Sequence, residues 1–535
     1  MPAMLDWTSR RARPLRPALP ACPAASWQQA LGASPARAAL RLWRGFLITP
    51  ALLLGATGPL PAQPLDEAAR AAAVTVAAPA ATAVSMQLPH EVAALLARAQ
   101  LPEQALAAVV LDTRSERAPL LSWRAGEPVS PASTLKLVTT YAALDLLGPA
   151  YRWHTRVYSD GPVHDGVLRG NLYLQGGGDP KLVSERLWLL LRRVQGTGVR
   201  RIAGDLVLDH SAFELPPSDP GAFDGEPLRP YNAAADALLI NYRAQVFSFT
   251  PDPAAGVARV ALEPPLAGVE FPASVPLDGG RTPGCGDWRG LLRADFSDPL
   301  RPRFAGRYPS ACGEREWPIA HPEPERLAER AVAGLWQSLG GRIDGRVRDG
   351  QVPAGATLRL SFESPPLAEV VRETNKYSNN VMAQQIFLTL GLGAEDDAPA
   401  TPASARLALQ RWWQARLGTD TPLPEVGNGS GLSREARLSA GALAQLLQLA
   451  WQSPLMPDLA ASLPASGLDG TLRRSEMGAG LAHLKTGSLK DVLALAGYVH
   501  GTGGQRRVLV AIVNHANARA ARPALDALVQ WAATR

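Results

Sequence analysis

Residues 131–140 read PASTLKLVTT and place a serine, Ser133, three residues before a lysine, Lys136. Pro131 precedes the expected start of a helix, and apolar residues then recur at helical spacing up to Gly148. Because residues three apart share a helix face, the hydroxyl and the amine lie side by side. A serine nucleophile needs an adjacent base, and a desolvated lysine can serve as one. An ordinary helix start, with Ser133 as its cap, is the simpler interpretation of an isolated match.

Lysine is rare in this chain, which makes two other stretches informative. Only five of the 54 basic residues are lysines, and with 29 serines a chance Ser-x-x-Lys arises roughly a quarter of the time. Residues 378–380 (SNN) fall in a polar break between expected helices, and residues 485–487 (KTG) begin an expected strand. Together with residues 133–136 they complete a known triple of motifs in its usual order. Chance produces all three on the order of a few per cent of the time.

The pattern of motifs resembles that of the penicillin-recognising serine acyltransferases, the penicillin-binding proteins and serine β-lactamases. The first two motifs of β-lactamases lie much closer together than the 245 residues between Ser133 and Ser378. This spacing resembles the low-molecular-mass D-alanyl-D-alanine carboxypeptidase/endopeptidase group of penicillin-binding proteins, in which a large domain is inserted there. Other stretches matching the group are 170–182, 232–251, 374–380 and 428–434.

Two residues depart from the habits of this group. Asn428 stands where the group usually has Asp, and Gln384 stands where it usually has Glu. Neither residue belongs to the three motifs, so the departures bear on substrate detail more than on reaction type.

The resemblance implies an α+β fold, in which a helical subdomain packs on a five-stranded antiparallel sheet with the site between them. We therefore expect five parts: an extension and signal peptide (1–62), a linker (63–88), the transpeptidase-like domain (89–155 and 365–535) and a β-rich insertion (156–364). The segments that carry strand or helix patterns are a hairpin at 106–123, insertion strands at 169–176, 200–210, 241–251 and 356–364, helices at 365–391 (broken at 375–380), 402–418 and 438–452, three strands at 481–489, 491–501 and 506–516, and a final helix at 522–534.

The resemblance also implies catalytic roles. Ser133 is expected to be the acylated nucleophile and Lys136 the base that activates it. Ser378 would relay a proton to the leaving group. The backbone N–H groups of Ser133 and Ser488 would form the oxyanion hole.

Four further residues are implied to bind substrate. Asn380 would hold the substrate amide, and Lys485 and Thr486 would bind the substrate carboxylate. Gly487 would let the backbone approach the substrate closely.

The basic excess of the chain, a formal net charge of +6, lies in its first 63 residues, which carry seven arginines and one acid. The remaining residues have no net charge, so nucleic acid is not an expected partner. Arginines precede the apolar run at 45–58, and a cleavage site follows at Ala62, the pattern of a secretory signal for the periplasm. A membrane anchor or an unstructured leader is the alternative, and peripheral membrane contact stays open.

The cysteines and histidines indicate one disulfide and no metal site. Cys22 would leave with the leader, whereas Cys285 and Cys312 are expected to form a disulfide that contributes roughly 3 kcal/mol. Two buried thiols are the alternative. Because the sequence has no CxxC or HExxH motif and its eight histidines are scattered, we expect no metal and no cofactor.

The sequence therefore predicts an exported serine-type D-Ala-D-Ala carboxypeptidase and D-alanyl endopeptidase. Its expected partners are peptidoglycan stem peptides as substrates and β-lactams as covalent inhibitors. A β-lactamase or esterase on the same fold is the first alternative, and a non-catalytic peptidoglycan-binding protein is the second. The balance of the two activities, the third stem-peptide residue, the oligomeric state and the role of the insertion remain open.

Overall fold

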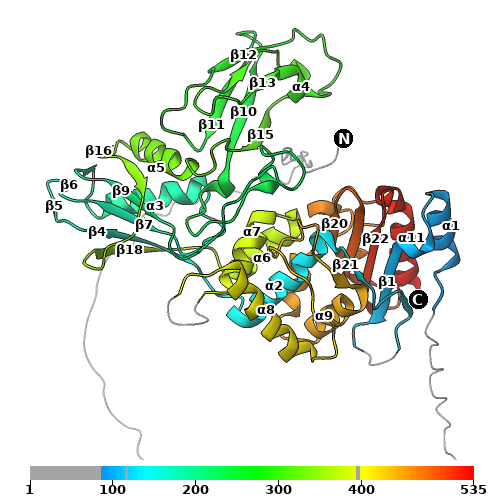
Figure 1. Cartoon of the computed structure of the whole chain (residues 1–535). Coiled ribbons are helices and arrows are strands. Elements are labelled where there is room, and N and C mark those ends of the chain that lie inside the picture. Colours follow the sequence, from blue (N-terminus) through cyan, green and yellow to red (C-terminus); the bar gives the residue numbers. More distant parts are fainter. Residues whose placement is uncertain (1–85, 115–117, 393–397) are drawn as a thin grey trace, which may run out of the picture. The chain divides into compact units, whose positions relative to one another are not determined.

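The computed structural model describes residues 86–114, 118–392 and 398–535 (Figure 1). The predicted signal, its cleavage site after Ala62 and Cys22 lie outside the described residues, as does nearly all of the predicted linker. No helix among the described residues is both long enough and apolar enough to span a membrane.

An antiparallel sheet of five strands, in the order β2-β1-β22-β21-β20, confirms the α+β expectation. The strands are β1 (Leu106–Asp112), β2 (Leu121–Trp123), β20 (Ala482–Ser488), β21 (Val492–His500) and β22 (Arg506–Asn514). Strands β1 and β2 form the predicted hairpin, and β20–β22 are the three predicted C-terminal strands. Successive residues of β1 and β22 are buried, because both faces of the sheet are covered.

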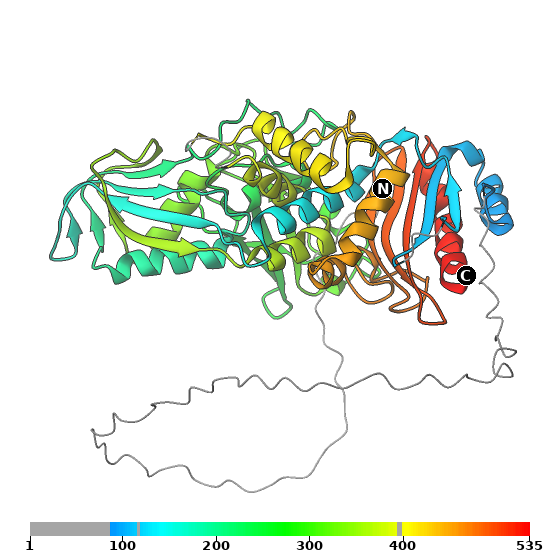
Figure 2. The same ribbon diagram turned by 90° about the horizontal axis from the view of Figure 1, so that it is seen from below.

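Helices cover the two faces of this sheet with separate apolar cores (Figure 2). α1 (His90–Arg98) and α11 (Arg522–Thr534) pack on one face. α9 (Ala440–Gln452) packs on β1 and β22 from the opposite face, where α2 (Lys136–Leu147) shares its core. Residues Lys136–Leu144 are all buried, so α2 is a central helix rather than an amphipathic one.

The first motif does not begin an α-helix directly. Residues Ala132–Leu135 form a 3₁₀ turn, η3, and α2 starts at Lys136. The helical segment ends as predicted at Gly148, whose φ of 81° is costly for other residues.

The polar break at 375–380 separates α6 (Leu367–Tyr377) from α7 (Asn380–Thr389). Ser378 ends α6 in the left-handed conformation, and the Asn379 side chain caps α7 by accepting from the Met382 N–H at 3.1 Å. The helices that complete this part are α8 (Pro402–Leu417) and α10 (Met456–Ser462), and a short strand pair joins β3 (Pro128–Val129) to β19 (Leu438–Ser439).

The insertion leaves and rejoins the helical part at adjacent points. β4 (His154–Ser159) pairs antiparallel with β18 (Thr357–Glu363), and His154 lies opposite Glu363. The two strands belong to a five-stranded mixed sheet in the order β17-β9-β7-β4-β18, with β7 (Leu172–Gln175), β9 (Leu206–Asp209) and β17 (Val347–Asp349). A long insertion therefore adds little strain to the domain that it interrupts.

The rest of the insertion is β-rich but includes helices and parallel strands that the sequence analysis did not predict. Its other elements are β5 (Val163–His164), β6 (Val167–Leu168), α3 (Ser184–Gly196), β8 (Arg201–Ile202), β10 (Ala244–Asp252), β11 (Val257–Glu263), β12 (Ser274–Pro276), α4 (Trp288–Leu292), β13 (Ala294–Asp295), β14 (Arg303–Phe304), β15 (Arg315–Ala320), α5 (Leu327–Ser338) and β16 (Arg342–Ile343). One apolar cluster, drawn entirely from Val157–Phe362, forms the core of this region.

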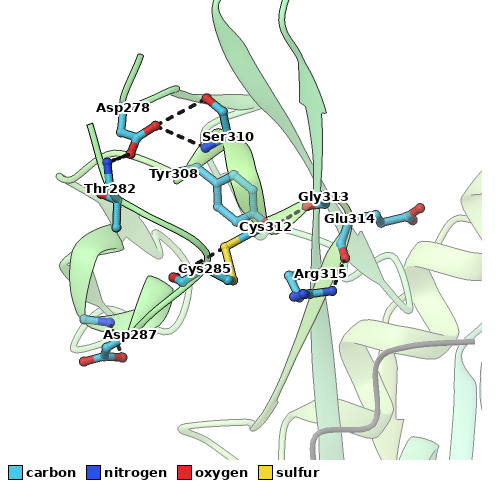
Figure 3. The surroundings of a disulfide bond; sticks show 11 residues. Asp278, Thr282, Cys285, Asp287, Tyr308, Ser310, Cys312, Gly313, Glu314 and Arg315 are labelled. Atoms are coloured by element: carbon cyan, nitrogen blue, oxygen red, sulfur yellow. Dashed lines mark hydrogen bonds between the residues drawn. A yellow bond between two sulfur atoms is a disulfide. The ribbon is translucent and has the colours of Figure 1, made fainter. Parts of the chain in front are cut away.

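Cys285 and Cys312 are joined by a disulfide in the insertion, with their Cα atoms 4.5 Å apart (Figure 3). Nearby, the Asp278 carboxylate accepts hydrogen bonds from the backbone N–H groups of Ser310 at 3.1 Å and Thr282 at 2.9 Å. The disulfide and this carboxylate both connect the loop after β12 to the segment before β15.

Candidate active site

Lys136 is fully buried at the start of α2, and its amine contacts three oxygen atoms. Nζ lies 3.0 Å from Ser133 Oγ, 2.7 Å from Asn380 Oδ1 and 2.6 Å from the carbonyl oxygen of Ser430. The three partners come from chain segments far apart in the sequence. The amine is thus the point at which η3, α7 and the loop after α8 meet.

Two unusual backbone positions hold the Ser133 turn in place. Ala132 has a φ of 47°, a sparsely populated conformation for a non-glycine residue. Gly431, with a φ of 77°, lies directly against it, since a Cβ at Gly431 would be 1.9 Å from the Ala132 carbonyl oxygen. Only a glycine in the loop after α8 lets that loop approach the serine so closely.

The second and third motifs meet through a hydrogen bond from Lys485 to Ser378. Lys485 Nζ donates to Ser378 Oγ at 2.8 Å and to the Thr486 carbonyl oxygen at 2.8 Å. Lys485 is fully buried, and desolvation lowers its pKa to about 7. Burial lowers the pKa of Lys136 well below its usual range, with a further contribution from the charge of Lys485.

Asn380 links Lys136 to the insertion. Its Oδ1 accepts from Lys136, and its Nδ2 donates to the Tyr231 carbonyl oxygen at 3.0 Å. Further along α7, Gln385 accepts from the Asp236 N–H at 2.9 Å and donates to the Asp236 carbonyl oxygen at 2.8 Å. The 231–236 stretch of the insertion therefore runs along α7 and fixes the orientation of the Asn380 amide.

β20 is the edge strand of the five-stranded sheet, and it lies against η3. The Leu484 N–H donates to the Pro464 carbonyl oxygen at 2.9 Å, so it points away from β21. Because alternate N–H groups of a strand point to one side, the N–H groups of Thr486 and Ser488 share this direction.

Gly487 brings β20 close to η3. A Cβ there would lie 2.9 Å from the Pro131 carbonyl oxygen and 3.2 Å from Ala132 Cβ. The observed close approach is therefore to η3, and the predicted approach to substrate stays a prediction.

The structure brings all the predicted site residues into one neighbourhood, with the helical motifs on one side and β20 on the other. Among described residues, no group of three or more His, Cys, Asp and Glu side chains is arranged to hold a metal ion. The arrangement offers the Ser133 hydroxyl, a buried amine beside it, and a second amine and a threonine hydroxyl on the edge strand β20.

A comparison with families of known proteins covers nearly all of the described chain. Residues 88–535 match the sequence model of the D-Ala-D-Ala carboxypeptidase 3 (S13) family. The chain belongs to this family. The predicted resemblance to low-molecular-mass penicillin-binding proteins is therefore confirmed, as is the enzyme class of serine D-Ala-D-Ala carboxypeptidase.

Two proteins named D-alanyl-D-alanine carboxypeptidases resemble the chain over most of its length. A D-alanyl-D-alanine carboxypeptidase of Actinomadura sp. (strain R39) is 29% identical over 459 residues, which cover 80% of this chain and 81% of that protein. The D-alanyl-D-alanine carboxypeptidase DacB of Haemophilus influenzae is 25% identical over 405 residues, covering 72% and 80%.

The solved structure of penicillin-binding protein 4 from Haemophilus influenzae has the same fold. It superposes with a TM-score of 0.66 at 22% identity and covers 83% of this chain and 99% of its own. A second structure of that protein, in complex with a β-lactam, gives a TM-score of 0.61.

Asn428 and Gln384, the two residues that the sequence analysis singled out, each make a hydrogen bond in the structure. The Asn428 Oδ1 accepts from the Ser430 N–H at 3.1 Å and from Ser430 Oγ at 2.8 Å, so the amide oxygen does here what a carboxylate oxygen could do. Gln384 donates to the Ala233 carbonyl oxygen at 3.4 Å, on the 231–236 stretch.

Two groups that hold the site were missed by the sequence analysis. The carbonyl oxygen of Ser430 contacts Lys136, and that of Tyr231 contacts Asn380. Because every residue has a backbone carbonyl, the identity of these two residues does not predict the contacts. Only the glycine at 431 could have indicated that the loop after α8 approaches another backbone.

Gly431→Ala is expected to displace the Ser133 turn, because its Cβ would clash with the Ala132 carbonyl. The expected result is a loss of at least tenfold in the rate at which benzylpenicillin labels the protein, together with a lower melting temperature. Gly256→Ala is the matched control, since Gly256 also has a positive φ, 67°, but no atom within 4 Å of its Cβ position. Equal acylation rates in the two variants would contradict this reading.

Proposed function

We propose that this S13 carboxypeptidase works through an acyl-enzyme on Ser133, with Lys136 as the base. The observation that carries the proposal is the set of contacts around Lys136 Nζ. Two of its three partners are carbonyl oxygens, which only accept hydrogen bonds, whereas the Ser133 hydroxyl can donate. A neutral amine fits this set, because its two hydrogens serve the carbonyls of Asn380 and Ser430 while its lone pair faces Ser133.

Acylation then follows as a transfer of one proton and one acyl group. Lys136 takes the hydroxyl proton as Ser133 Oγ attacks the carbonyl of the D-Ala–D-Ala bond. The backbone N–H groups of Ser133 and Ser488 stabilise the oxyanion, which is supported by the outward direction of the Ser488 N–H. Lys136 then gives up that proton, Ser378 relays it to the leaving nitrogen, and the C–N bond breaks. D-alanine is released, the acyl group stays on Ser133 Oγ, and Lys136 is neutral again.

Deacylation restores the enzyme with one water molecule. Water attacks the carbonyl carbon of the Ser133 ester while the neutral Lys136 takes one of its protons. Lys136 passes that proton to Ser133 Oγ, the ester C–O bond breaks, and the shortened stem peptide leaves as a carboxylic acid. The sum is peptide plus water giving shortened peptide plus D-alanine. β-Lactams would form the same ester, but their ring-opened product stays attached and blocks the water step.

The substrate carboxylate is proposed to bind at the Lys485 end of the site. Lys485 supplies the positive charge, Thr486 a hydroxyl, and Asn380 retains one N–H for the substrate amide. A positively charged Lys485 also favours the neutral form of Lys136, because two like charges repel.

Incubation with benzylpenicillin is expected to add one ring-opened antibiotic to the intact protein, at Ser133. Ser133→Ala should show no adduct, and Lys136→Ala should acylate at least 10³-fold more slowly, since the serine loses its base. Lys490→Ala, which removes an exposed lysine from the turn between β20 and β21, is the control and should acylate like the wild type. An adduct that persists in Ser133→Ala overturns the assignment.

The pH dependence of acylation should separate the two buried lysines. For benzylpenicillin, the second-order rate should fall above pH 7, because Lys485, with a pKa of about 7, loses the charge that attracts the carboxylate. On the acid side the rate should fall as Lys136 gains a proton. The methyl ester of benzylpenicillin lacks the carboxylate and should show the acid limb alone; an identical alkaline limb for both compounds contradicts the role of Lys485.

We further propose endopeptidase cleavage of D-alanyl cross-links by the same acylation, with a larger leaving group. A digest of purified sacculi, analysed by mass, distinguishes the two activities. Loss of terminal D-alanine reports the carboxypeptidase, and conversion of cross-linked dimers to monomers reports the endopeptidase. Dimers that remain intact while terminal D-alanine is lost would exclude endopeptidase activity.

Export to the periplasm is proposed from the N-terminal pattern, and a disulfide in the insertion fits an oxidising compartment. N-terminal sequencing of the protein recovered from a periplasmic extract tests it, with cleavage expected after Ala62. An uncleaved chain in the cytoplasm would refute the proposal.

A further inference from the structure

Three of the five lysines are buried, and the mechanism uses only two of them. The third, Lys376, lies in the last turn of α6, two residues before Ser378. Its amine pairs with Asp469 Oδ2 at 2.5 Å, and Asp469 Oδ1 accepts from the Ala465 N–H at 2.8 Å. This ion pair connects the end of α6 to the loop that precedes β20.

The same loop lies along the edge of β20. The Ser466 N–H donates to the Ala482 carbonyl oxygen at 2.9 Å, and the Leu484 N–H donates to the Pro464 carbonyl oxygen at 2.9 Å. Gly470 packs against α6, since a Cβ there would lie 2.5 Å from the Lys376 carbonyl oxygen. Residues 464–472, which we name the edge loop, are therefore held by both elements that carry the second and third motifs.

The edge loop places one hydroxyl at the substrate end of the site. Thr471 Oγ1 lies 2.9 Å from Thr486 Oγ1, and both side chains are only partly buried. A hydroxyl has a single hydrogen. Thr486 can donate that hydrogen to Thr471 or to a bound carboxylate, but not fully to both.

We propose that Thr471 is a positioning residue for carboxylate recognition, acting through Thr486. When a carboxylate binds, the hydrogen bond between the two threonines reverses: Thr471 donates to Thr486 Oγ1, and Thr486 turns its own hydrogen to the carboxylate. Charged acceptors form the stronger hydrogen bond, which drives the reversal. The Lys376–Asp469 pair holds Thr471 at the required distance. This inference rests on the proposed binding of the substrate carboxylate at Lys485 and Thr486.

Thr471→Val keeps the shape of the side chain and removes the hydroxyl. The measurement is kcat/KM for a peptide ending in D-Ala-D-Ala and for its C-terminal amide. We expect the peptide acid to lose about tenfold, mainly in KM, and the ratio of acid to amide to fall about tenfold. Thr471→Ser should retain the wild-type ratio, since it restores the donor. Thr471→Ala removes the hydroxyl without adding a branched side chain, and it should show the same loss as Thr471→Val.

A double-mutant cycle with Thr486→Val tests whether Thr471 acts through Thr486. The ratio of kcat/KM for the acid to that for the amide should be no lower in the double variant than in Thr486→Val alone. Additive losses in the double variant would overturn the proposal. Equal losses for acid and amide in Thr471→Val, which leave their ratio unchanged, would also overturn it. If the wild type fails to form a Ser133 adduct with benzylpenicillin, the proposed function fails and the inference falls with it. An active wild type with an unaffected Thr471→Val removes the Thr471 role alone.

Discussion

The burial of Lys136 is the constraint on which the site depends. A charged ammonium in an apolar core is very costly, so a fully buried lysine must be neutral or surrounded by oxygen atoms. Here the oxygens come from η3, from α7 and from the loop after α8. α2 packs against α7 and α8, which bring the second and third of these segments to the amine. The lysine thus fixes the mutual positions of three segments as well as the chemistry of the serine.

The insertion is part of this arrangement, not an addition to it. Its two ends are adjacent strands, β4 and β18, which explains how the fold accepts roughly two hundred inserted residues. Yet its 231–236 stretch runs along α7 and binds both Asn380 and Gln385. Removal of the insertion would leave a buried glutamine and a catalytic-site amide without their partners, which is costly for polar groups.

Contacts of the site that follow from local geometry could be predicted from the sequence. Contacts that are made through backbone atoms could not. The proximity of Ser133 and Lys136 follows from helical spacing, and the strands and helices of the C-terminal part follow from periodicity. The convergence of the three motifs came from the resemblance to a family, because no local pattern states that Lys485 contacts Ser378. The contacts through carbonyl oxygens, and the start of the first motif as a 3₁₀ turn, depend on tertiary packing.

The pairing of β1 with β22 has a consequence for how the chain is made. Val109 lies opposite Val510. The first strand of the sheet therefore cannot pair with β22 until about 400 more residues have been synthesised. At a typical ribosomal rate of about 10 residues per second, that interval is on the order of 40 seconds. The core of the insertion uses residues 157–362 alone and can assemble during this time. The neighbourhood of Ser133, in contrast, includes Lys485 on β20, which joins the sheet through β21 and β22, so it is complete only after these late strands have been made.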